Sequence, residues 1–254
     1  MAYIEKMIKY LAIGLFFIAM LGFTHQAKSQ TAEEFGYGSK VVSSPSKRIW
    51  YHVRIDSGLL LPGDAIIVRD GSADKLEPDG VGWDIGFSFG GSFNRGSIVQ
   101  VDVTGVVNYS RWHGSITPGV EFGNDPMPGN KILVEGTKTI IEANWRPLVS
   151  DKGFISPFLG LGLGMDIVSW LNSDISKTPN YKKSALGVIG IFQISSGFDW
   201  FFATNWAIGF KYNYWLPFSE GIEVGSISES GVAKPIIYNP SNSHALNFSI
   251  TAAF

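Results

Sequence analysis

The chain of 254 residues contains no cysteine. It can therefore form neither a disulfide nor the acylated N-terminal cysteine of a lipoprotein. An exported protein without disulfides takes its stability from a buried core or from a membrane. Histidine is also scarce, and the four histidines are scattered along the chain. From this pattern we expect no metal site and no cofactor.

Charge is sparse as well, since charged residues make up 17% of the chain and the formal net charge is −2. No basic stripe is present, which argues against nucleic acid as a partner. Beyond residue 23 no apolar run approaches the ~20 residues that a membrane helix requires. What the chain has instead is glycine (30 residues), phenylalanine (18) and tryptophan (8), and the aromatic residues among these favour strands.

The first 29 residues have the layout of a secretory signal peptide. Lys6 and Lys9 precede the apolar run Leu11–Phe23, and Ala27-Lys28-Ser29 places small residues before a cleavage point ahead of Gln30. A transmembrane helix is the alternative, but this run is short for a bilayer. We therefore expect a signal peptide at 1–29, a periplasmic N-terminal segment at 30–47 and a β-barrel at 48–254.

The C-terminal segment Ala245–Phe254 alternates with a period of two. Apolar residues occupy one face, including Leu246, Phe248, Ile250 and Phe254, and small or polar residues occupy the other. This pattern predicts a strand, and its length matches the ~9–11 residues that a tilted strand needs to cross a bilayer. An apolar strand that ends on an aromatic residue also resembles the assembly signal of outer-membrane proteins.

Seven more alternating segments precede this one. The eight predicted strands are Arg48–Asp56, Val81–Gly91, Ile98–Tyr109, Lys131–Trp145, Phe154–Trp170, Ser184–Phe202, Trp206–Phe218 and Ala245–Phe254. Short turns alternate with long loops, and the long loops are Ser57–Gly80, Arg111–Asn130, Leu171–Lys183 and Glu220–Asn242. Transmembrane barrels show this asymmetry, with short periplasmic turns and long extracellular loops. The sequence predicts an all-β, antiparallel, up-and-down transmembrane barrel of eight strands, with ten as the alternative because residues 30–47 and the first loop have room for another hairpin.

The polar faces of these strands carry charge. Arg54, Asp84, Asp102, Asp166 and Lys211 fall on them, and Lys138, Glu142 and Asp199 join them if two less regular strands keep their register. A soluble barrel also alternates, but so many inward charges do not suit a carrier of apolar ligands. In a membrane barrel the charges pair in the lumen while the apolar face meets lipid.

Aromatic residues gather near the predicted strand ends, where membrane barrels carry two interfacial belts. We assign one belt to the extracellular ends and one to the periplasmic ends. The extracellular belt contains Trp112, Trp170 and Trp215, and the periplasmic belt contains Trp145, Trp200 and Trp206.

Three short motifs carry a resemblance to a known family. Pro157–Gly164 resembles the glycine-rich strand of small OmpA-like and OmpX-like barrel domains, and Gly197–Trp200 followed by Asn205–Ile208 resembles their late periplasmic turn. The resemblance implies a cell outer-membrane location in a Gram-negative bacterium. It also implies outer-membrane lipid, lipopolysaccharide and the β-barrel assembly machinery as partners. The peptidoglycan-binding domain of full OmpA-type proteins is not expected.

Three functions are compatible with such a barrel, which is only wide enough for its own side chains to fill. The first is a non-enzymatic structural or adhesive role, with host or surface ligands bound by the four long loops. The second is carriage of small hydrophobic molecules, as a resemblance to OmpW-like barrels implies, with Leu59–Leu61 and Ile66–Val68 at a hydrophobic mouth.

The third function is acyl hydrolysis. His113-Gly114-Ser115 resembles the His-x-Ser pair of lipid A deacylases, where histidine activates serine, and Glu121 or Glu135 could orient the histidine. The pair falls in a Gly- and Pro-rich predicted loop, which departs from that family. We therefore keep His113 and Ser115 as remote candidates and expect no enzyme.

Overall fold

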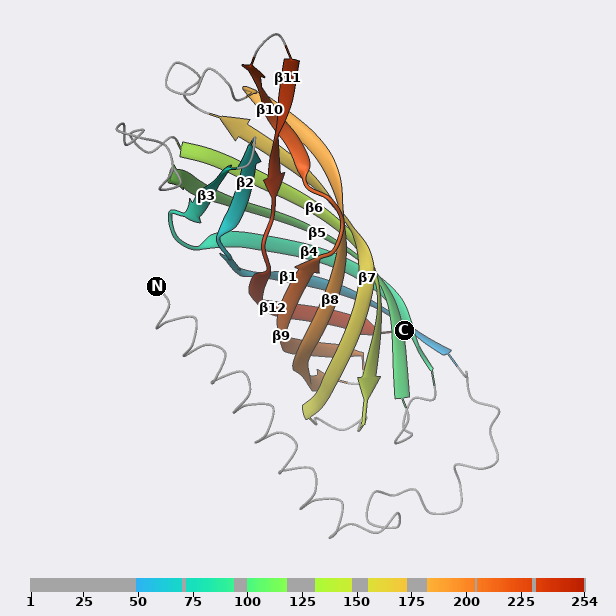
Figure 1. Ribbon diagram of the computed structural model, residues 1–254. Helices are drawn as coiled ribbons and strands as arrows, with labels where there is room; N and C mark the ends of the chain where they lie inside the picture. The colour runs from blue at the N-terminus through green and yellow to red at the C-terminus, as the bar shows by residue number, and fades with distance from the viewer. Residues whose placement is uncertain are drawn as a thin grey trace, which may run out of the picture. The chain divides into compact units, whose positions relative to one another are not determined.

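The computed structural model describes residues 49–69, 72–93, 100–117, 131–147, 155–172, 182–203, 205–229 and 232–253. These ranges consist of strands and of short connections between them (Figure 1). Within them no helix is long and apolar enough to span a membrane. The predicted signal peptide, the segment at 30–47 and Phe254 lie outside the described residues.

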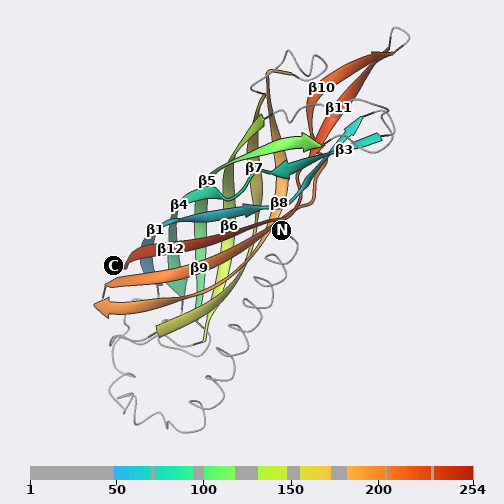
Figure 2. The ribbon, with the colours of Figure 1, turned by 90° about the vertical axis from the view of Figure 1, so that its left-hand side faces the viewer.

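Eight strands close into a barrel, as the sequence predicts. They are β1 (Ile49–Pro62), β4 (Gly82–Phe93), β5 (Gln100–Thr117), β6 (Lys131–Arg146), β7 (Ile155–Asn172), β8 (Ser184–Ala203), β9 (Trp206–Pro217) and β12 (Ser243–Ala253). Each pairs antiparallel with its neighbours in the order β1-β4-β5-β6-β7-β8-β9-β12, and β12 pairs with β1 to close the ring (Figure 2).

Alternation along each strand separates the two faces of the wall. Along β4 every second residue is buried in the lumen, while Trp83, Ile85, Phe87 and Phe89 point outward and are each about half exposed. The same outward apolar face continues around the barrel, with Ile141 at 70% and Phe248 at 71% exposure. So much exposed apolar surface belongs in lipid, as in transmembrane barrels with apolar exteriors and polar interiors.

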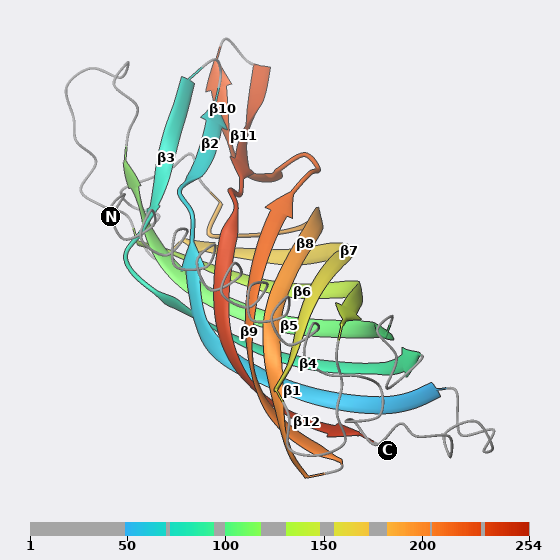
Figure 3. The same ribbon diagram turned by 90° about the horizontal axis from the view of Figure 1, so that it is seen from below.

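Four further strands lie beyond the extracellular end of the barrel. They are β2 (Ala65–Arg69), β3 (Ser72–Pro78), β10 (Ile222–Glu229) and β11 (Val232–Asn239). Each continues one barrel strand, so that β1 leads into β2, β3 into β4, β9 into β10 and β11 into β12 (Figure 3). The extracellular strands keep the pairing of the barrel strands that they continue. β2 pairs with β3 and β11, as β1 pairs with β4 and β12, and β10 pairs with β11, as β9 pairs with β12.

Proline marks each of the four breaks. Pro62, Pro78 and Pro217 are the last residues of β1, β3 and β9, and Pro240 follows β11. Proline has no backbone N–H to donate, so it interrupts the hydrogen-bonded ladder where it stands. On the opposite side β5, β6, β7 and β8 run unbroken for 16 to 20 residues. One half of the wall is therefore continuous. The other half, which we call the jointed side, is interrupted at the level of the four prolines.

The prediction of eight barrel strands is confirmed, and the alternative of ten is wrong. The first long loop does contain a hairpin, but β2 and β3 extend existing strands instead of adding two to the ring. Several predicted strand ends are too early on the extracellular side, because β1 runs six residues beyond Asp56 to Pro62 and β5 eight beyond Tyr109 to Thr117. Much of Ser57–Gly80 and Glu220–Asn242 is strand instead of loop.

Candidate functional site

The lumen below the proline breaks is filled by paired charges. Near its periplasmic end Arg146 bonds both Asp102 and Asp199, and Arg54 bonds Asp199 in turn; all four side chains are buried. The Phe158 ring packs against both guanidinium groups, with its centroid 5.2 Å from Arg54 Cζ and 4.8 Å from Arg146 Cζ. These five residues, which we call the periplasmic plug, fill the barrel with a network of charge-assisted hydrogen bonds.

A second pair lies further toward the outside. Lys211 Nζ is 2.8 Å from Glu142 Oε2, and both side chains are almost fully buried. Glu142 also accepts hydrogen bonds from Ser195 Oγ and from Gln193 Nε2, the latter at 2.8 Å. The strand register explains the meeting, since Gln193 and Ser195 face Glu142 across the glycines of β7.

The extracellular half of the lumen has a different character. One cluster of buried apolar side chains fills it, from Leu60 and Trp112 up to Ile67 and Ile236 on the added strands. Lys138 marks the boundary: its Nζ donates to Ser110 Oγ at 2.6 Å, lies 3.5 Å from Asp166 Oδ2 and sits 4.5 Å from the Trp215 ring centroid.

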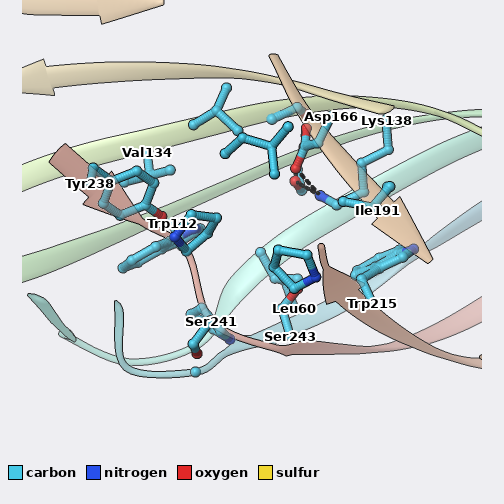
Figure 4. Close-up of a pocket in the computed structure, with 18 residues that line it drawn as sticks. Leu60, Trp112, Val134, Lys138, Asp166, Ile191, Trp215, Tyr238, Ser241 and Ser243 are labelled. Atoms are coloured by element: carbon cyan, nitrogen blue, oxygen red, sulfur yellow. Dashed lines mark hydrogen bonds and ion pairs between the residues drawn. The ribbon is translucent and has the colours of Figure 1, made fainter. Parts of the chain in front are cut away.

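A cavity of about 50 Å³ opens within this apolar cluster. Trp112, Val134, Ile191 and Tyr238 line its walls, and the Lys138–Asp166 pair lies at one side (Figure 4). The prolines of three breaks, Pro62, Pro217 and Pro240, line it as well. A cavity with mostly apolar walls and a few convergent polar groups is the usual form of a small-molecule site.

All the predicted lumen residues point inward. Arg54, Asp84, Asp102 and Lys211 are buried, and Asp166 is 13% exposed. Lys138, Glu142 and Asp199, which came from the less regular strands, are buried beside them. Sequence reasoning missed Asp56 and Arg146, because the predicted strands placed each of them at or beyond an end.

The predicted extracellular belt is wrong for its three tryptophans. Trp112, Trp170 and Trp215 are at most 9% exposed and belong to the apolar cluster inside the barrel. Their positions have the parity of the lumen face: Trp112 follows Asn108 and Ser110 at intervals of two, and Trp215 follows Lys211 and Asn213. The grouping by strand end overlooked this parity.

The periplasmic members of the predicted belts point outward instead. Trp145, Trp200 and Trp206 are 43 to 48% exposed near the periplasmic strand ends. In the assembly-signal strand, Phe248 and Ile250 are exposed on the outer face and Leu246 is half-buried on the same face. Phe254, the last residue of this motif, is not among the described residues.

The candidate pair His113 and Ser115 lies on β5, so its assignment to a loop is wrong. Both side chains are on the outer face, and Ser115 Oγ donates a hydrogen bond of 2.6 Å to Asp79 Oδ1. Glu135 accepts a hydrogen bond from Tyr109 at 2.6 Å, and Glu121 is outside the described residues. The arrangement therefore pairs the serine with a carboxylate and not with the histidine that would have to activate it.

Comparison with known proteins supports the fold but does not show what the protein does. No protein-family model matches the chain, and no curated protein matches it. Among solved structures, the outer membrane protein OprG from Pseudomonas aeruginosa is similar at 12% identity, with a TM-score of 0.54 over 82% of this chain and 97% of OprG.

Two further structures match with TM-scores below 0.5. Neisserial surface protein A is 14% identical, with a TM-score of 0.40 over 80% of this chain and 97% of its own. The N-terminal β-barrel domain of Pseudomonas aeruginosa OprF is 12% identical, with a TM-score of 0.42 over 82% and 98%. The closed ring of eight antiparallel strands, its apolar outer face and its charged lumen identify the chain as a small outer-membrane β-barrel protein.

Proposed function

We propose that the protein carries small, largely apolar molecules that enter from the cell surface. The observation behind this proposal is the cavity inside the extracellular half of the barrel. Its walls are mainly apolar, and Lys138, Asp166 and the buried Tyr238 supply a few polar groups. Such a lining favours a ligand with an apolar body and one polar end.

The size of the cavity sets a condition on this function. A volume of about 50 Å³ accommodates only about three to five water molecules. A larger ligand therefore requires the wall to move. The jointed side favours such movement, because the ladder between β1 and β12 ends at Pro62 and Ser243 and pairing resumes at Ile66 and Asn239, with a single backbone hydrogen bond of 3.0 Å from Gly63 N to Asn242 O in between.

The periplasmic plug opposes passage of a ligand straight through the barrel. Arg54 and Arg146 fill the lumen with buried ion pairs, and breaking buried pairs costs several kcal/mol. A straight passage through the barrel would have to break them. The apolar half alone is therefore the part that we assign to the ligand.

A fluorescence experiment tests this proposal. The purified barrel in lipid nanodiscs is titrated with cis-parinaric acid, a fluorescent fatty acid with an apolar chain and one carboxylate. Its conjugated chain accepts excitation energy from tryptophan. Val134→Phe replaces a small side chain of the cavity wall by a bulky aromatic ring, and Ile141→Phe on the same strand changes only the lipid face, where Ile141 is 70% exposed. We expect saturable energy transfer in the wild type and in Ile141→Phe, and at least a tenfold lower affinity for the fatty acid in Val134→Phe. Equal affinity in both variants would contradict the carrier.

Surface binding is the second candidate. On the outer face of β2, Ile66 is 51% and Val68 is 39% exposed, and exposed apolar patches favour contacts with partners. Replacing both by serine should reduce adhesion of expressing cells to a host-cell layer if this face binds. Unchanged adhesion would count against the hairpin.

A further inference from the structure

The cavity of the extracellular half carries its charges at one place. Of the described residues that line it, Lys138 and Asp166 are the two charged ones, and the others are apolar or neutral. They stand opposite each other on neighbouring strands, because Lys138 of β6 is paired with Asp166 of β7. Figure 4 shows the pair at one side of the cavity. The polar end of a bound molecule would therefore meet both charges together.

This ion pair is more open than the pair between Lys211 and Glu142. Lys138 Nζ lies 3.5 Å from Asp166 Oδ2, whereas Lys211 Nζ lies 2.8 Å from Glu142 Oε2. Charge-assisted hydrogen bonds from nitrogen to a carboxylate are ordinarily about 2.7–2.9 Å long. Lys138 and Asp166 thus attract each other as neighbours without a tight hydrogen bond, and each can take a second partner.

Asp166 retains an acceptor that no described residue uses. Its Oδ1 atom has no hydrogen-bond partner among these residues, and the side chain is 13% exposed. Gly136 provides space for the carboxylate, because a Cβ atom there would lie 2.7 Å from Asp166 Oδ1 and 3.1 Å from Ser110 Oγ. Gly136 and Ser110 line the cavity as well. The carboxylate and the serine hydroxyl therefore lie close together in the cavity wall.

Lys138 is held at the same place by two further contacts. Its Nζ donates to Ser110 Oγ at 2.6 Å and lies 4.5 Å from the centroid of the Trp215 ring. An ammonium group has three hydrogens to donate and cannot accept a hydrogen bond. Ser110 uses one of them, so Lys138 can still donate to an oxygen that enters the cavity beside Asp166.

The head groups of amphiphilic molecules differ in what they offer this pair. A carboxylate only accepts hydrogen bonds and an ammonium only donates them, so each would satisfy one member of the pair and be repelled by the other. Each would also bring an uncompensated charge into a cavity where Lys138 and Asp166 already neutralise each other. A hydroxyl group is neutral, accepts from an ammonium and donates to a carboxylate. It is therefore the smallest head group that satisfies both side chains.

We propose that Lys138 and Asp166 select ligands with an uncharged, hydroxyl-bearing end, so that the carried molecules are apolar alcohols. This inference rests on the proposed carriage of apolar molecules and specifies their chemical class. The ligand hydroxyl accepts a hydrogen bond from Lys138 Nζ and donates one to Asp166, while the apolar body lies against Trp112, Val134 and Ile191. A fatty acid binds as well, but more weakly, and best while its carboxyl group is protonated.

Three fluorescent probes that differ only in their head group test this selectivity. They are cis-parinaric acid and the alcohol and primary amine with the same conjugated chain. Each is titrated into barrels in lipid nanodiscs and followed by energy transfer from tryptophan, at a mildly alkaline pH where the acid is ionised and the amine is still charged. The ratio of the affinities for two probes is compared between variants, because partitioning into the lipid is the same for all variants and cancels.

Two substitutions leave opposite halves of the pair. Asp166→Asn leaves the cation, and Lys138→Met leaves the carboxylate. Asp64→Asn is the matched control, because it removes a carboxylate that is 48% exposed and pairs with Lys75. Heat-dependent gel mobility verifies that each variant is folded.

In the wild type and in Asp64→Asn we expect the alcohol to bind at least tenfold more tightly than the ionised acid. In Asp166→Asn this ratio should fall at least tenfold, because Lys138 then attracts the carboxylate without competition. In Lys138→Met the amine should gain at least tenfold over the alcohol, because Asp166 then attracts the ammonium group. If one variant does not fold, the other variant and the ratio in the wild type decide.

Two results would overturn the selectivity and leave the carriage itself intact. One is equal affinity of the three probes in the wild type, and the other is an unchanged ratio in the folded variants. Absence of saturable transfer for every probe would overturn the proposed carrier and this inference together.

Discussion

Replacing Lys211 by methionine should destabilise the barrel strongly. Its Nζ lies 2.8 Å from Glu142 Oε2, and the two side chains are 3% and 1% exposed. At that separation, with an effective dielectric constant of about 20, the attraction is about 6 kcal/mol before the cost of desolvation is counted. Methionine keeps the apolar stem but leaves Glu142 charged and without its cation. The removal of one partner of a buried pair costs about 3–5 kcal/mol.

The double variant Lys211→Met with Glu142→Gln separates charge from packing. It leaves no charge at the site, and the glutamine can still bond Ser195 and Gln193. We expect the double variant to be destabilised by at least about 3 kcal/mol less than the sum of the two single variants.

Urea unfolding in lipid vesicles, followed by tryptophan fluorescence, measures these free energies when the slope with denaturant is unchanged. Lys75→Met is the control, since Lys75 forms exposed pairs with Asp64 and Glu77 and should leave the midpoint unchanged. A loss below about 1 kcal/mol for Lys211→Met, or additive single variants, would refute a tightly coupled buried pair.

Three further outcomes follow from the geometry. Gly58→Ala should cost at least about 2 kcal/mol, because its Cβ would meet Leu246 O at 1.9 Å, whereas Gly105→Ala, with one contact at 3.8 Å, should be nearly neutral; urea unfolding compares them. Ile141→Arg on the lipid face should cost about 2–4 kcal/mol and Tyr51→Arg near the periplasmic end about 0–1, and equal costs would argue against this placement in the membrane. Burial raises the pKa of Tyr238 above its usual value near 10, so that the folded state holds this proton more tightly than the unfolded one and loses stability as the pH rises above about 10. Tyr238→Phe should reduce that alkaline loss, and an identical decline in both proteins would contradict the assignment.

Much of the barrel could be predicted because period-two alternation follows from strand geometry alone. The lumen positions of Arg54 and Asp102 came from parity, and parity would also have placed Trp112 inside. The error arose from a rule about strand ends that ignored which face a residue occupies. Local sequence patterns thus predict the fold correctly when the facing of each residue is assigned from its own position in the alternation.

The candidate sites could not be predicted in the same way. Asp84 and Asn247 are 163 residues apart and meet only because β12 closes the ring against β1. The cavity depends on β11 returning over the mouth to bring Tyr238 beside Trp170, whose ring centroids are 5.4 Å apart. Such meetings depend on register between distant strands, on which the sequence of any one strand carries no information.

The proline breaks have a mechanical consequence. Four adjacent strands are interrupted at one level, while β5 to β8 cross that level as continuous ribbons. We therefore expect bending resistance to be unequal around the circumference, with the extracellular section able to bend at the level of the prolines within the limits that the β3–β5 ladder sets. Pro62, Pro217 and Pro240 line the cavity, so bending at this level would change its volume.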